Sequence, residues 1–174
     1  MIKVKPEIKA NLELARIGGI FENLGFTTKT IEKNALVPFP ILLLYFPESY
    51  SKGISEVGFS FIPITSENEL SVKLLQMTTA FELELPSERK ALLFEVLLAI
   101  NTRTPLGSFS VNGNGELLFR YVHSMPTYQF IEEKPFLDTL NFFVHTIEAF
   151  LPLIKRLIKG NINREDALKQ ALEG

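Results

Sequence analysis

Two histidines are the first residues of this sequence to consider for chemistry. His123 follows an alternating apolar segment, and His145 lies within a long segment with apolar residues at helical spacing. A metal site needs several ligands at fixed spacing, and neither histidine has a second histidine or a carboxylate four residues further on. We therefore expect an exposed strand-end His123 and a helix-surface His145. The sequence predicts no catalytic residue, no metal ligand and no cofactor-binding residue.

Two acidic pairs are the next candidates. Glu82 and Glu84 alternate onto one face of a predicted strand, as carboxylates for acid-base chemistry or Mg²⁺ binding would. Exposed strand faces commonly carry such pairs, so we interpret them as a solvated face. Glu132 and Glu133 precede a predicted helix, whose N-terminal end favours negative charge without any catalytic role.

Glycines and phenylalanines give two further patterns. The turn Gly113-Asn114-Gly115 is similar to a phosphate-binding loop, but no helix N-terminus follows it to offer amide donors. We interpret it as a hairpin turn. The chain has 15 Phe residues, which lie at helical and strand-face spacings without interleaved basic residues. They are typical of a core rather than of a base-stacking platform.

Length and composition indicate one ordinary globular domain, residues 1–174, with 46% hydrophobic and 22% charged residues. The net charge of −2, with scattered Lys and Arg, gives no electrostatic attraction to nucleic acid or an anionic membrane, and we expect neither as a partner. The absence of cysteine fits a reducing compartment, so a cytoplasmic location is expected.

No membrane span or secretory leader is expected. The first seven residues lack a following apolar run. The uncharged run at 35–47 is too short to cross a bilayer and contains prolines, and the longer stretch 136–158 is interrupted by charged residues.

Periodicity predicts an alternation of helices and strands. Helices are expected from Pro6 to about Gly25, over 86–100, from Lys134 to about Gly160, and after a capping Asn163. Strands are expected at 26–32, 39–46, 56–64 and within 70–85, followed by a hairpin with arms 109–111 and 116–123. The fold class is therefore α+β, a single antiparallel β-sheet of about five strands packed by helices.

Excess apolar surface is the one functional indication. The strand from Ile41 is apolar at every position, and the helix over 86–100 is nearly so, which is more than one sheet layer easily covers. A dimer contact or client groove would cover the excess, but so would a central place in the monomer core. The candidate interface residues are Leu42, Leu44, Leu93, Val96, Leu97 and Ile100.

A family resemblance accompanies these patterns. The segments Ala99-Ile100-Asn101, Pro105 to Phe109 and Gly115 to Tyr121, in this order of elements, resemble the YbjN-like family over about 86–156. That family looks like the type III secretion chaperones in fold. The resemblance implies the order α-β-β-β-α-β-β-α, here with an extra C-terminal helix, and a homodimer that binds protein segments or acts as a regulatory adaptor. It implies no catalytic residues.

The leading hypothesis is therefore a non-enzymatic, protein-binding adaptor, chaperone-like or regulatory, that acts as a homodimer with a protein or peptide client. The alternative is a small-molecule sensing module with a pocket between sheet and helices. An enzyme would need a constellation of side chains that only folding brings together.

Overall fold

The computed structural model describes residues 6–35, 37–51, 53–63 and 71–173. Within these ranges four helices and six strands follow one another. The helices are α1 (Pro6–Asn23), α2 (Lys90–Asn101, preceded by a short 3-10 turn at Ser87–Arg89), α3 (Glu133–Ile158) and α4 (Arg164–Glu173). The strands are β1 (Thr27–Ile31), β2 (Ile41–Tyr45), β3 (Glu56–Ile62), β4 (Val72–Phe81), β5 (Ser108–Val111) and β6 (Leu117–Pro126).

The sheet is single and antiparallel throughout, in the order β1-β2-β3-β4-β6-β5. This confirms the predicted fold class with one strand more than the expected five. Four strands precede α2, which agrees with the four segments predicted there and differs from the three strands of the order that the resemblance implies. The predicted strand within 70–85 ends earlier than expected, at Phe81.

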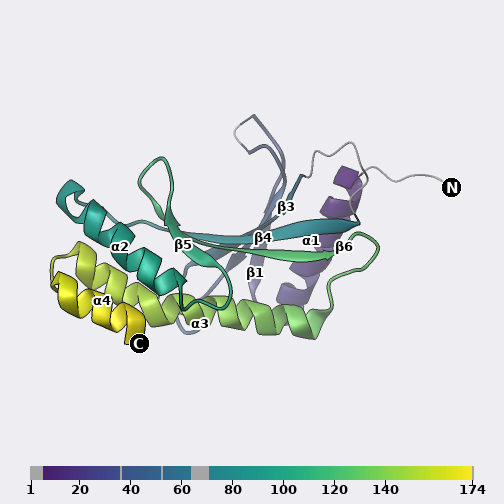
Figure 1. The fold of residues 1–174 in the computed structure, drawn as a ribbon. Helices are drawn as coiled ribbons and strands as arrows, with labels where there is room; N and C mark the ends of the chain where they lie inside the picture. Colours follow the sequence, from purple (N-terminus) through teal and green to yellow (C-terminus); the bar gives the residue numbers. More distant parts are fainter. Residues whose placement is uncertain (1–5, 36, 52, 64–70, 174) are drawn as a thin grey trace.

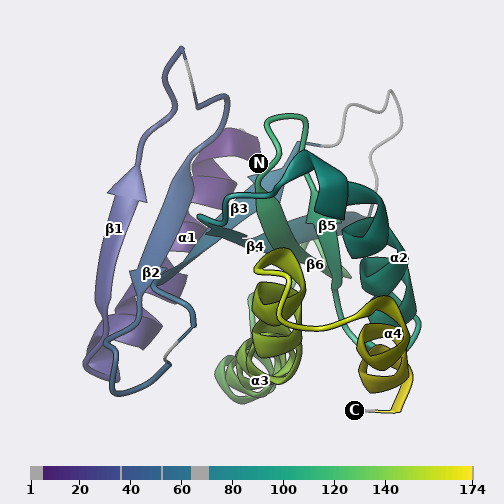
Figure 2. The ribbon, with the colours of Figure 1, turned by 90° about the vertical axis from the view of Figure 1, so that its left-hand side faces the viewer.

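All four helices gather on one side of the sheet, which we call the inner face. In Figure 1, α3 and α4 lie below the strands and α2 lies at the left, beside β5, and Figure 2 shows α1 behind β1 and β2. The ring of Phe21 in α1 lies 5.4 Å from that of Phe59 in β3, and Phe143 in α3 lies 4.9 Å from Phe119 in β6. Helix α1 packs on β2 at Gly18, where an added Cβ would lie in ordinary van der Waals contact with Leu42, at 3.4 Å.

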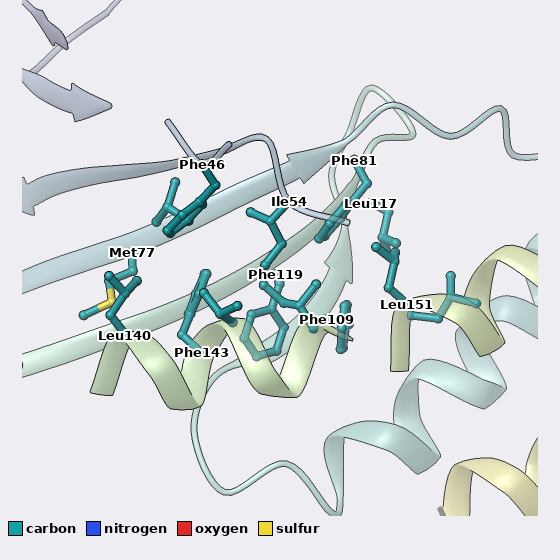
Figure 3. Close-up of a cluster of buried hydrophobic side chains, with 14 of the residues drawn as sticks. Phe46, Ile54, Met77, Phe81, Phe109, Leu117, Phe119, Leu140, Phe143 and Leu151 are labelled. Atoms are coloured by element: carbon teal, nitrogen blue, oxygen red, sulfur yellow. The ribbon is translucent and has the colours of Figure 1, made fainter. Parts of the chain in front are cut away.

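The core lies between α3 and the inner face (Figure 3). Each buried Phe or Leu side chain contributes roughly 1.5–3 kcal/mol of transfer free energy. The apolar stripe predicted for α3 is buried over its whole length, which confirms it: Phe136, Leu140, Phe143, Val144, Ile147, Leu151, Ile154 and Ile158. By length and composition this 26-residue helix could cross a membrane, but a core helix passes the same test, and this stripe packs against the sheet.

The predicted hairpin is confirmed. Its turn is closed by the side chain of Asn112, whose Oδ1 accepts hydrogen bonds of 3.0 Å from the amides of Asn114 and Glu116. Gly115 has a φ of 86°, in the left-handed region that favours glycine. Arg120 points away from the core on the second arm, as expected.

The free side of β5 is covered by one side chain of α2. Asn101 accepts a hydrogen bond of 2.8 Å from the backbone N–H of Phe109 and donates one of 2.9 Å to its carbonyl. Both polar groups that this residue would otherwise present at the sheet edge are therefore satisfied.

A buried carboxylate ties α1 to the segment before α3. Glu13 is only 3% exposed, pairs with Lys73 of β4 and accepts a 3.0 Å hydrogen bond from the Ile131 amide. Arg16, one turn further along α1, donates a 2.7 Å hydrogen bond from its guanidinium to the Ile131 carbonyl. These contacts compensate the cost of burying the charge.

The last helix packs on α2. Asn163 caps it, since its Oδ1 accepts a 2.8 Å hydrogen bond from the Asp166 amide, as predicted. Ala167 and Ala171 are buried, and Arg164 forms an ion pair with Glu95 of α2. The C-terminal helix therefore widens the helical layer near β5 and leaves the other face of the sheet untouched (Figure 1).

Candidate partner-binding surface

The six candidate interface residues lie inside the chain. All are at most 4% exposed and belong to the core: Leu42, Leu44, Leu93, Val96, Leu97 and Ile100. This is a correction to their assignment as a contact surface and fits the core alternative. The reason is geometric: the leucines of β2 point to the inner face, and the four residues of α2 form its inward stripe.

The residues between them in sequence are the surface ones. Ile41 and Leu43 of β2 point to the outer face of the sheet, where they lie over Gly58 at distances of 3.4 and 3.6 Å from the position of an added Cβ. Both are half-buried rather than enclosed. The uniformly apolar sequence of β2 gave no signal for which alternate set faces inward.

Neighbouring strands extend this apolar surface. Ile31 lies opposite Ile41, and Ile62 lies opposite Leu74, while Val122 of β6 follows on the same face. We call this set the outer apolar patch: Ile31, Ile41, Leu43, Ile62, Leu74 and Val122, all half-buried. No described helix covers it (Figures 1 and 2).

Polar groups border the outer apolar patch on β4 and β6. Arg120 donates a 2.6 Å hydrogen bond from Nε to Oε1 of Gln76. Beside them Thr78 has a buried Oγ1 without a hydrogen-bond partner in the described part of the chain. A polar border around an apolar centre is typical of protein contact surfaces.

Exposed apolar residues also occur on α2. Leu98 is 69% exposed and Phe94 is 44% exposed, one turn apart on the side away from the core. Lys90 lies over the Phe94 ring at 5.8 Å. This pair is smaller than the outer apolar patch and lies on the helical side of the molecule.

The space between sheet and helices is filled by side chains, as Figure 3 shows. Two shallow surface grooves are present instead, with volumes of about 410 and 620 Å³. Neither groove lies between the sheet and the helices, where the hypothesis of a sensing module places its pocket.

The histidines and acidic pairs fall into different places. His145 and the pairs Glu82/Glu84 and Glu132/Glu133 are exposed, as predicted. His123 was expected to be exposed, but it is half-buried within β6, because the strand continues to Pro126 along β4. Burial lowers its pKa from the ordinary value of 6.5. Among the described residues no three His, Asp or Glu side chains gather closely enough to hold a metal ion.

These features define an α+β protein with one helix-covered and one open sheet face. A family profile described as "Putative bacterial sensory transduction regulator" matches residues 58–156, more than half of the chain. The chain therefore belongs to the YbjN family, and the predicted membership is confirmed.

A solved structure is also similar: "Crystal structure of YbjN, a putative transcription regulator from E. coli". The two are 14% identical, with a TM-score of 0.46, over 85% of this chain and 90% of that one. No curated protein matches the chain.

Proposed function

We propose that this member of a regulator family is a non-enzymatic adaptor that acts through protein contacts, as a homodimer formed across the outer apolar patch. A chaperone-like mode of action, with a protein or peptide client, belongs to the same proposal. The same proposal includes a cytoplasmic location and the lack of nucleic-acid and membrane partners. The net charge of −2 supports the lack of those partners.

The carrying observation is the open apolar face of the sheet. Six aliphatic side chains from β1, β2, β3, β4 and β6 lie on a side that no described helix covers. Removing such surface from water contributes roughly 25 cal/mol per Å² of apolar area. Contiguous apolar patches on monomers mark contact surfaces, because they are otherwise aggregation liabilities.

A second copy is the proposed occupant of this face. Because a two-fold axis brings the same patch against itself, a patch with an apolar centre is self-complementary without matching charges. None of the six side chains of the outer apolar patch is charged, while Lys29 of β1 lies opposite Leu43 on the same face and Arg120 lies at the border.

The test is solution mass by light scattering over a dilution series. The unmodified chain is expected at twice 19.7 kDa. Leu43→Lys, on the outer face of β2, should shift the mass to that of the monomer, because a charge would be buried at the contact. Leu172→Lys is the matched control, since Leu172 is 55% exposed on α4, and it should leave the dimer intact.

A monomeric mass at every concentration would refute the homodimer. Equal dissociation by both lysine variants would place the contact elsewhere. Circular dichroism spectra of the variants should match that of the unmodified chain, which separates dissociation from unfolding.

A further inference from the structure

A groove between the β2–β3 connection and α3 has the features of a binding site. Its volume is about 410 Å³, and it is lined by Tyr50, Asn141, Phe142, Val144, His145 and Glu148. Tyr50 comes from the connection, and the other residues come from successive turns of α3. The groove shares no residue with the outer apolar patch.

One wall of the groove is fixed by the core. The ring of Tyr50 stacks on the buried Phe46 at a centroid distance of 4.9 Å and an interplanar angle of 7°. Phe26 meets the same ring edge-on at 5.1 Å. The Tyr50 hydroxyl donates a 3.0 Å hydrogen bond to Oδ1 of Asn141, which joins the wall to α3. A wall that is held in place before a ligand arrives lowers the entropic cost of binding.

The groove combines aromatic surface with an unpaired negative charge. Tyr50 is 42% exposed and Phe142 is 56% exposed. Glu148 has no hydrogen-bond or ion-pair partner among the described residues. Burial and, secondly, the charge of Glu148 raise the pKa of Tyr50 above 10.0, so the field of this carboxylate reaches the groove.

These features select the charge and the chemical class of a ligand. The described residues that line the groove include a carboxylate, Glu148, and neither a Lys nor an Arg, so their fixed charge favours a cation over an anion. The described residues offer no group of carboxylates and histidines for a metal ion. Aromatic faces beside a carboxylate instead favour an organic cation, which gains both cation–π attraction and an ion pair.

We propose that this groove binds the alkyl cation of an arginine or lysine side chain presented by a protein segment. The apolar stem lies against Phe142 and Tyr50, and the cationic head meets Glu148. The source of the cation rests on the proposed protein-binding function, whereas the groove itself is independent of the dimer contact.

The test is an NMR titration of the full chain with a capped Gly-Gly-Arg-Gly-Gly peptide and with the same peptide carrying citrulline, a neutral analogue of arginine. The arginine peptide should give saturable shifts at Tyr50 and along 141–148. The citrulline peptide should bind at least about tenfold more weakly, because it loses the charge-assisted contact.

Three variants complete the test. Glu148→Gln should weaken binding of the arginine peptide about fivefold, and Phe142→Ala about two- to fivefold. Glu133→Gln is the matched control, since it makes the same change on α3 outside the groove and should leave the affinity unchanged. Matching circular dichroism spectra show that the variants are folded.

Equal affinity for the two peptides, or unchanged affinity in Glu148→Gln, would overturn the proposal. Spermidine that saturates the same signals while the arginine peptide leaves them unshifted would overturn the protein source. Light scattering of Glu148→Gln should still give the mass of the unmodified chain, so failure here is distinguishable from failure of the homodimer.

Discussion

At the scale of single residues, His123 shows how a partner strand changes a side chain's surroundings. Its Nδ1 lies 3.4 Å from the Tyr121 hydroxyl, within a strand that β4 extends to Pro126. The sequence around it indicated a strand end, because the length of β6 is set by pairing with a strand some 45 residues earlier in the chain. The pKa of its imidazole is lowered by burial.

This lowered pKa predicts a loss of stability in mild acid. The folded state keeps His123 neutral, whereas the unfolded chain binds a proton as the pH falls below about 6.5. The urea midpoint should therefore decrease as the pH is lowered from 7.5 to 5.5. His123→Gln should make this decrease smaller. His145→Gln, on the exposed surface of α3, should retain it. An unchanged slope in His123→Gln would contradict the prediction.

Thr78 gives a second prediction at this scale. Its Oγ1 is buried without a partner in the described part of the chain, and such an unsatisfied group costs stability. Thr78→Val, of nearly the same shape, should raise the free energy of unfolding by about 1 kcal/mol in urea denaturation. Thr30→Val on exposed β1 controls for the strand preference of valine. A gain no larger than that of the control would show that the hydroxyl carries no penalty.

At the scale of elements, patterns with one dominant apolar face were predictable from the sequence. The stripe of α3 and the Asn-Gly hairpin turn have local causes, which are helical spacing and positive φ. The inward set of β2 was not predictable, because Ile41 to Tyr45 is apolar on both faces. The packing of α4 on α2 was not predictable either, because the sequence of α4 indicates an apolar side but not the element that this side contacts.

The two faces of α2 can be told apart by paired substitutions. Leu97 is 4% exposed in the core, and Leu98 is 69% exposed beside it. Leu97→Asp should unfold the monomer, with a loss of more than about 3 kcal/mol, because it buries an unpaired charge. Leu98→Asp should leave the thermal midpoint nearly unchanged by circular dichroism. A Leu97→Asp variant that is folded but dissociated would contradict this prediction and would indicate that Leu97 lies in an interface.

At the scale of the whole molecule, the helices divide its surface into two kinds. One side carries α3 with the aromatic groove at Tyr50 and Glu148, and the other carries the outer apolar patch. The two surfaces have no residue in common, so self-association and recognition of a basic segment can occur on one chain at the same time. Nothing in the sequence separated these surfaces, because their residues meet only after the sheet has formed.

The contact between Asn101 and Phe109 has a consequence for assembly. Strands β1 and β5 form the two edges of the sheet, and these edges are not equivalent. At β5 the side-chain amide of Asn101 is hydrogen-bonded to the outward N–H and carbonyl of Phe109. A strand from another copy would have to displace Asn101 before it could add at β5. Growth by joining β1 of one copy to β5 of the next, which would give an open fibre, is thereby opposed by a single side chain.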